Sequence, residues 1–438
     1  MSIYGLRMTS GPTISWRSIE CWGAGTCLFL QTGALFPLLL SDPDGALSDH
    51  SKSLLRLVSL PVYAFTVLIL TKNLPLFLMA LRRNLLLPLM LMLPFLSILW
   101  SISPSLSLRR AVGLLFTMLL AYVLAMRFTP RQLLLLVFAT LGTCIVLSLA
   151  MFAVAPHLAR MPMDSEMRGI FINKNSLGWY SCIMILAATV VLIDGTLGLR
   201  RTAFILLAAS GICLVASGSM TATIATASAF GLIGFYSALQ RSSGIGRIVL
   251  VLLFVQLAAG LLISLHEFLV PFLEALGKDA TLTGRVPLWE LVDRQIASHL
   301  MFGFGYQAFW TEANPGAWSI WSEVLWMAPH AHNGYRDAML SFGIIGTTFF
   351  VLLLLRAVHQ GAILQCRNPQ YGWLWLNVFT VMVLVMNLTE SIFLVQNDAI
   401  FILFSTAIIM FSLYVPAVSA EVDQGWRMPI TRPDPSIP

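Results

Sequence analysis

The chain has little charge for its length. Only 11% of its 438 residues are Asp, Glu, Lys or Arg, whereas 58% are hydrophobic and the mean hydropathy is +0.83. A water-soluble domain is usually about a quarter charged, and its surface needs that polar cover. This composition excludes a soluble globular protein and predicts an integral membrane protein.

Several chemical signatures are also missing. The six cysteines are scattered and form no CxxC pair, so neither a zinc site nor a disulfide framework is predicted. The motifs GxxxxGK[ST], HExxH and GxSxG are absent, which argues against a P-loop ATPase, a zinc protease and a serine hydrolase. The net charge of +6 is modest and no soluble basic face is predicted, so nucleic acid is not expected as a partner. No cofactor and no metal site are expected.

Long apolar runs are abundant, and about 20 mostly apolar residues are enough to cross a membrane as a helix. The sequence predicts an all-α, polytopic membrane fold with about twelve transmembrane helices. These are expected at residues 23–40, 57–71, 84–100, 111–126, 132–155, 175–194, 203–217, 219–239, 248–266, 333–355, 371–388 and 397–415.

Basic residues in short loops indicate the orientation of such a chain. With the N-terminus in the cytoplasm, every inner loop carries Lys or Arg, for example Arg127 with Arg131 and Arg200 with Arg201. We therefore predict a bacterial inner-membrane protein with both termini inside. Its predicted parts are a cytoplasmic segment (1–22), nine helices (23–266), a long periplasmic loop (267–332), three helices (333–415) and a cytoplasmic tail (416–438).

Three outer regions present arginine against this rule. Each of these arginines alone is compatible with a tolerated outer charge, because the rule is statistical. Together they predict an anion site at the outer face, since the guanidinium fork binds phosphate through paired hydrogen bonds and suits a diphosphate. The residues are Arg109 and Arg110, Arg160 and Arg168, and Arg285 and Arg294.

The long outer loop contains many aromatic residues, among them Trp289, Trp310 and Trp326. Such side chains anchor a protein at the level of the lipid headgroups, or they stack on the apolar faces of sugar rings. The sequence leaves both interpretations open. Charged residues are scarce in the middle of the apolar runs, where a transporter would usually carry them, so chemistry at the membrane surface is favoured.

The segment HAHNGYRDAMLSFGIIG places His332 where the outer loop enters the tenth predicted helix. A neutral imidazole there can accept a proton from a hydroxyl, although a lone interfacial histidine more often only forms a cap or a hydrogen bond. Arg336 is expected one turn further along the same helical face. Gly343 and Gly346 are expected to let a neighbouring helix approach closely.

Six segments in order resemble the O-antigen ligase and polymerase family, which includes exopolysaccharide polymerases of the succinoglycan type. The family's pattern of His-Asn, nine residues, Gly, two residues, Gly is matched in full. One departure is Met220, because many members carry a basic residue in this short turn. The segments are WSISPSLSLRR (100–110), RGIFINKNSLGWY (168–180), TGRVPLWE (283–290), GFGYQAFW (303–310), HNGYRDAMLSFGIIG (332–346) and NLTESIFL (387–394).

The resemblance implies a membrane-embedded, GT-C-like, metal-independent glycosyltransferase. Such an enzyme moves a glycan from undecaprenyl diphosphate to a sugar hydroxyl outside the cytoplasmic membrane. By resemblance, Arg168 and Arg285 would grip the diphosphate and His332 would activate the acceptor hydroxyl. Residues expected to line the donor pocket are Arg109 or Arg110, Asn175 and Tyr306. Further residues expected to bind substrate are Asn333, Arg336 and Glu390, and orienting His332 is the alternative role expected of Glu390.

The interpretation that fits best is a polymerase of lipid-linked repeat units, with membrane lipids and a flippase or chain-length and export proteins as further partners. A ligase that moves finished glycan onto a lipid A core or a protein is the alternative within the same class. A transporter or flippase for lipid-linked sugars, and a scaffold subunit, are the alternatives from other classes.

Overall fold

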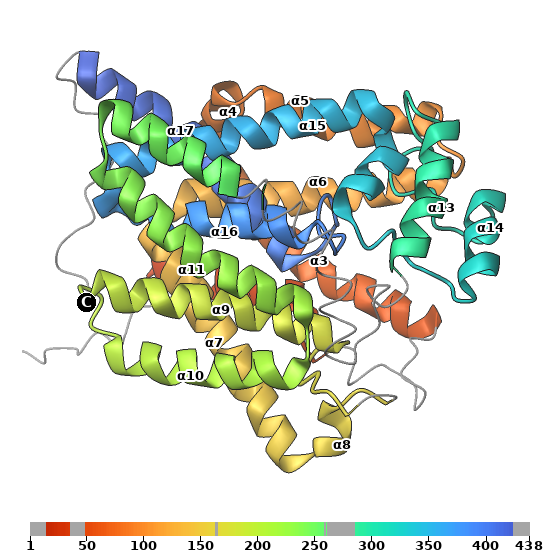
Figure 1. Cartoon of the computed structure of the whole chain (residues 1–438), viewed down its shortest axis with the longest axis horizontal. Helices are drawn as coiled ribbons and strands as arrows, with labels where there is room; N and C mark the ends of the chain where they lie inside the picture. The colour runs from red at the N-terminus through yellow and green to blue at the C-terminus, as the bar shows by residue number, and fades with distance from the viewer. Residues whose placement is uncertain (1–14, 36–48, 163–164, 258–259, 261–284, 424–438) are drawn as a thin grey trace, which may run out of the picture.

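The computed structural model describes residues 15–35, 49–162, 165–257, 260 and 285–423, and helices dominate this part of the chain (Figure 1). Within these residues the extended backbone forms one isolated bridge, between Arg160 and Met167. The helices are α1 (Trp16–Gln31), α3 (Asp49–Lys72), α4 (Leu74–Arg83), α5 (Leu86–Leu96), α6 (Pro104–Arg127), α7 (Pro130–Val154), α8 (Pro156–Ala159), α9 (Lys174–Asp194), α10 (Arg200–Ser217), α11 (Met220–Arg241), α13 (Arg285–Ser298), α14 (Pro315–Val324), α15 (Gly334–Arg367), α16 (Trp373–Met386) and α17 (Ala399–Asp423), with short 3-10 turns at Ser97–Leu99 and Pro369–Tyr371.

Six of these helices, α6, α7, α9, α10, α11 and α15, are long and apolar enough to cross a membrane. The number rises to seven if Leu57–Lys72 and Leu74–Arg83, bent by 92°, count as one span. Four shorter apolar helices are Leu86–Leu99, Gly244–Leu257, Trp373–Met386 and Ala399–Val415. The expected all-helical membrane protein is confirmed, and each predicted stretch overlaps a helix, but the count of twelve spans stays a prediction.

Several helices begin earlier than the apolar pattern predicts, among them the first and fourth predicted helices. The first begins at Trp16, inside the segment expected to precede it, because the Ser15 hydroxyl caps it by accepting from the backbone N–H of Ser18. The fourth predicted helix, α6, begins at Pro104, a residue well suited to a first helical turn. Arg109 and Arg110 therefore lie on a helix rather than in the outer loop where they were expected.

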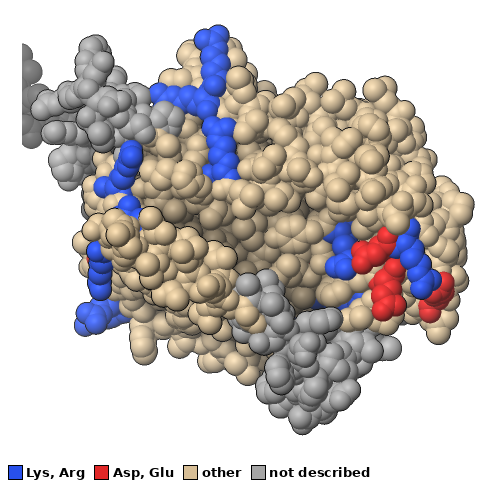
Figure 2. Space-filling view, turned by 45° about the horizontal axis from the view of Figure 1, so that its top comes forward, with Lys and Arg blue, Asp and Glu red and all other residues tan. Residues whose placement is uncertain are grey.

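The predicted inner loops meet at one end of the bundle. Glu20 is 2% exposed and pairs with Arg127 at 2.8 Å, and Arg127 also donates to the Asn73 side chain at 3.3 Å. Arg131 pairs with Asp194 at 3.1 Å and so joins α7 to α9. On the face seen in Figure 2, basic residues gather toward one end, a surface without charged side chains follows, and acidic and basic residues mix at the other end. Which end faces the cytoplasm stays a prediction.

The described part of the long outer loop has a small core of its own. Leu288, Val292 and Ile296 on α13 pack with Ile320 and Trp321 on α14. Figure 1 shows these two helices stacked beyond one end of the bundle, beside the start of α15. The described part of the loop is therefore a folded layer at one end of the helical bundle, and residues 261–284 lie outside this part.

The folded layer packs against a break in α15. Gly343 has φ 61° and ψ −165°, and a Cβ there would stand 2.3 Å from the Met301 backbone. The helix restarts with Ile344 donating to the Leu300 carbonyl at 2.8 Å. The expectation that Gly343 admits a neighbouring helix is wrong, because the close approach is made by the backbone of the outer loop. Gly346 does face a helix, since a Cβ at Gly346 would stand 3.5 Å from the Leu93 side chain of α5.

Replacing Gly343 with alanine is expected to destabilise the protein. The added Cβ meets backbone that has no rotamer to change, and the left-handed conformation costs about 1–3 kcal/mol for a residue other than glycine. The thermal midpoint of purified protein in detergent should fall clearly in Gly343→Ala. The matched control is Gly231→Ala on α11, where a Cβ meets open space, and equal midpoints for the two variants would contradict the prediction.

Candidate functional site

The site is built at the N-terminus of α15. Asn333 caps this helix, because its Oδ1 accepts from the backbone N–H groups of Tyr335 at 3.1 Å and Arg336 at 3.0 Å. Its Nδ2 donates to the Leu388 carbonyl at 2.9 Å, and its own N–H donates to the Ser391 hydroxyl at 3.1 Å. Asn333 therefore ties the start of α15 to the turn between α16 and α17.

Gly334 continues this junction. Its N–H lies 2.9 Å from the Asn387 carbonyl and 2.8 Å from the Glu390 carbonyl. A Cβ at this position would stand 2.1 Å from Oδ1 of Asn387, which also accepts from the N–H groups of Ile392 and Phe393. The HNG sequence thus provides a cap and a residue without a side chain where two loops touch.

His332 lies just before the cap and has φ 49°, a conformation that residues other than glycine rarely adopt. Strained residues of this kind cluster at functional sites. Because α15 begins at Gly334, the expected shared helical face of His332 and Arg336 is wrong. Arg336 instead forms a bidentate pair with Asp293 on α13, at 2.8 and 2.9 Å, and lies over the ring of Trp289.

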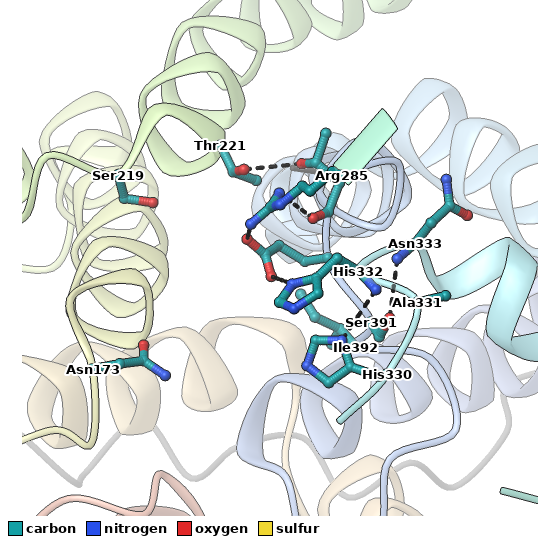
Figure 3. A network of polar contacts seen from close by, with 12 residues as sticks. Asn173, Ser219, Thr221, Arg285, His330, Ala331, His332, Asn333, Ser391 and Ile392 are labelled. Carbon is teal, nitrogen blue, oxygen red and sulfur yellow. Dashed lines mark hydrogen bonds and ion pairs between the residues drawn. The ribbon is translucent and has the colours of Figure 1, made fainter. Parts of the chain in front are cut away.

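Glu390 lies between His332 and Arg285. Its Oε1 accepts from Arg285 at 2.9 Å, and its Oε2 lies 3.8 Å from Nδ1 of His332 (Figure 3). The carboxylate is 2% exposed, so it is not a solvated loop acid. Nδ1 of His332 is buried and has no hydrogen-bond partner among the described residues. At 3.8 Å the two groups do not form a hydrogen bond, but an approach of about 1 Å would create one.

Arg285 also donates to the Thr389 carbonyl. The Thr389 hydroxyl lies 2.9 Å from that of Thr221, which connects the site to the first turn of α11. The bonds from Arg285 to Glu390 and to the Thr389 carbonyl use two of the five N–H donors of its guanidinium, and its side chain is 14% exposed. Arg285 is thus held in place with donors to spare.

His330, which the sequence did not single out, lies against His332. The ring centroids are 4.1 Å apart, and the backbone N–H of His332 donates to Nδ1 of His330 at 3.1 Å. Burial is the main reason that the pKa of His330 falls to about 4, and the neighbouring His332 lowers it further. The spacing His-Ala-His was the available signal, but alternate residues point toward the same region only in some loop geometries, and the sequence does not show which geometry forms.

A cavity of about 180 Å³ adjoins His330, and its lining includes two predicted residues, Arg110 and Tyr306. Arg110 donates to the Gln307 carbonyl, and the buried Tyr306 hydroxyl donates to the Leu394 carbonyl at 2.5 Å. Because adjacent residues on a helix point about 100° apart, Arg109 faces outward and is exposed. The structure therefore separates the two arginines that the sequence could not distinguish.

Arg168 lies in a second loop, between α8 and α9. Its side chain donates to the Leu158 carbonyl at 3.0 Å, it has no acidic partner among the described residues, and burial lowers the pKa of its guanidinium. The preceding residue, Met167, donates to the Ala216 carbonyl at the end of α10. No contact among the described residues joins Arg168 or Asn175 directly to His332.

The turn at residues 217–219 stands between this loop and Arg285. The Glu166 carboxylate lies against Gly218 and pairs with Lys174, the first residue of α9. The basic side chain of Lys174 therefore pairs with a carboxylate that lies against this turn, directly before Met220, in the region where many members of the resembling family carry a basic residue. It comes from a different segment, so inspection of the turn alone missed it.

Most tryptophans of the outer layer hold the layer together. Trp289 donates to the Ala331 carbonyl at 2.9 Å, Trp310 to the Asp337 carboxylate at 3.0 Å, and Trp321 to the Ala328 carbonyl at 2.9 Å. Trp326 differs, because it is 39% exposed and its ring centroid lies 5.8 Å from that of His332. Among the residues that the structure describes, no group of three or more His, Cys, Asp or Glu is placed to hold a metal ion.

Comparison with known proteins places these observations in context. Residues 203–351 match a family model described as O-antigen ligase, and this range includes Arg285, Tyr306 and His332. The chain is also 31% identical over 271 residues to the exopolysaccharide production protein ExoQ of Rhizobium meliloti (strain 1021). That match covers 60% of this chain and 61% of ExoQ, which is less than two thirds of the relative. Together the two comparisons confirm that this membrane protein is similar to the O-antigen ligase and polymerase family and to ExoQ within it.

Proposed function

We propose that this protein is a polysaccharide polymerase that joins oligosaccharide repeat units carried on undecaprenyl diphosphate. The observation that carries the proposal is the His332 imidazole, which stands beside the buried Glu390 carboxylate and between Arg285 and His330, a residue that lines a cavity large enough for a sugar ring. The printed name of ExoQ, an exopolysaccharide production protein, favours a growing polymer over transfer to a lipid A core.

In the proposed reaction, a hydroxyl of the acceptor sugar attacks the anomeric carbon of the donor. A new C–O bond forms while the bond from that carbon to the phosphate oxygen breaks, and the electron pair leaves with undecaprenyl diphosphate. The hydroxyl proton passes to His332. A single displacement of this kind inverts the anomeric centre, and the leaving group is already activated, so ATP is not required.

Glu390 supports His332 as the base. If Nδ1 of His332 carries its proton toward Glu390 Oε2, now 3.8 Å away, Nε2 keeps its lone pair for the acceptor hydroxyl. As the imidazole becomes positive, the buried carboxylate stabilises it. In this role Glu390 is a positioning residue that does not touch the substrate.

Arginine stabilises the departing diphosphate. The charge of Arg285 is partly offset by Glu390 at 2.9 Å, whereas Arg168 has no acidic partner among the described residues. Arg168 therefore brings the net positive charge, and Arg285 brings directed donors. Charge that develops on the phosphate oxygens during bond cleavage is stabilised by such preorganised donors.

A reconstituted transfer assay tests the proposal directly. Purified protein in liposomes receives lipid-linked repeat units alone, without ATP, and the products are sized on a gel. A ladder of repeat multiples is the expected result. Product that appears only after a lipid A core is added would indicate a ligase, and no product from well-folded protein would favour a transport or scaffold role.

His332→Ala is expected to reduce transfer by about 10²–10⁴-fold, the usual contribution of a general base. The protein should remain folded, because His332 lies at the surface of the site and its side chain is 19% exposed. The matched control is His157→Ala, which removes an exposed histidine from α8 in the same outer region. Full activity in well-inserted His332→Ala would remove this residue from the mechanism.

Arg168→Lys and Arg285→Lys should each lower the rate about tenfold or more. Lysine keeps the charge but loses the paired donors, and a hydrogen bond to a charged group contributes about 1.5–3 kcal/mol. Initial rates at saturating acceptor measure the loss, with the exposed Arg294→Lys as control. Two lysine variants that work at the rate of the wild type would contradict diphosphate binding by these arginines.

A further inference from the structure

The reaction as described so far assigns no substrate to the cavity beside His330. Its volume of about 180 Å³ is below the range of about 300–1,000 Å³ that is typical of pockets for larger ligands, so it suits a single sugar ring. The residues that matter for its chemistry are Arg110, Tyr306, Trp310, His330, Asp337 and Ala338.

The Asp337 carboxylate in the cavity wall is already saturated with donors. It accepts from the Trp310 indole at 3.0 Å, from the Ala331 N–H at 3.1 Å and from the Ser391 hydroxyl. These bonds fasten Trp310, the segment before His332 and the turn between α16 and α17 to one helix. Asp337 thus shapes the cavity and offers little to a ligand.

Two donors remain for a ligand. Nδ1 of His330 accepts from the backbone N–H of His332, so the neutral His330 ring carries its proton on Nε2. No partner for this Nε2 occurs among the described residues. With its pKa lowered to about 4 by burial, His330 is an uncharged donor at neutral pH. Arg110 uses a donor on the Gln307 carbonyl and keeps others.

The balance of charge distinguishes a sugar from a phosphate here. The lining contains one arginine, Arg110, and one aspartate, Asp337, so its formal charges sum to zero and no excess positive charge is present to hold a diphosphate. Its other walls include the rings of Tyr306, Phe309 and Trp310. Apolar ring faces with a few directed donors suit the apolar faces and hydroxyl groups of a pyranose.

The position of the cavity fits the direction of attack. Figure 3 shows His332 between Arg285 on one side and His330 on the other. An inverting displacement needs the attacking hydroxyl and the leaving phosphate on opposite sides of the anomeric carbon. With the phosphate on the arginine side, the hydroxyl must approach from the side of His330.

We propose that this cavity binds the acceptor sugar, a neutral pyranose, and that His330 holds this ring so that one hydroxyl reaches His332. This assignment rests on the proposed glycosyl transfer and makes it more specific. It also moves Arg110 and Tyr306 from the donor pocket, the place expected from the sequence, to the acceptor side.

The test separates the two substrates chemically. A repeat unit released from its diphosphate by mild acid can still accept but can no longer donate, so its KM reports the acceptor site alone. Undecaprenyl diphosphate without sugar reports the donor side, through its Kd. Two variants should weaken binding in the cavity: His330→Ala removes the N–H donor of the imidazole, and Ala338→Leu fills the cavity but leaves His330 intact. A third variant, His330→Gln, keeps an N–H donor and an acceptor.

We expect the KM for the free saccharide to rise about tenfold or more in His330→Ala and Ala338→Leu, because a hydrogen bond or the ring's space is lost. His330→Gln should restore part of the affinity, and the Kd of undecaprenyl diphosphate should not change in any variant. An unchanged saccharide KM in both variants, or a weakened Kd with unchanged KM, would overturn the assignment. If the wild type itself transfers nothing from the lipid-linked donor, the proposed function fails instead.

Discussion

The N-terminus of α15 is the constraint on which the site depends. The first N–H groups of a helix have no partner within it, and here they lie between a membrane bundle and a folded outer layer. Asn333 satisfies two of them, and the carbonyls of Asn387 and Glu390 receive the N–H of Gly334. These same bonds fix the turn that carries Glu390, so the capping of one helix also positions the carboxylate beside His332.

Asp337 extends this arrangement toward the outer layer. A carboxylate in the first turn of a helix is favoured by the helix dipole, and this one also accepts from Trp310 and Ala331. It therefore links the helix to two separate parts of the loop that precedes it. Elsewhere in the layer, the backbone around Met301 packs against the break in α15 at Gly343. Two contacts of different kinds, one polar and one steric, hold the layer over the site.

The opposite end of the bundle follows a different physical rule. There the arginines pair with buried acids such as Glu20 and with carbonyl or amide groups, so they serve helix packing as well as orientation. At the functional end, Arg168 lacks an acidic partner among the described residues and Arg285 has donors to spare. Arginines that are equivalent in a prediction of topology thus divide into structural and candidate functional residues according to their partners.

The sequence by itself determined the membrane class, the apolar stretches that became helices, and the segments that carry His332, Arg285 and Glu390, because hydrophobicity and charge patterns are properties of the chain. It did not show that α6 begins early enough to hold Arg110 over a cavity, or that Gly343 breaks α15, because helix ends depend on caps and on what packs nearby. The pairing of Glu390 with Arg285 spans 105 positions along the chain, and the tilted contact between the rings of His330 and His332 depends on the left-handed conformation of His332. Only the tertiary structure decided these, since loops far apart in sequence become neighbours when their polar groups must find partners at a crowded helix end.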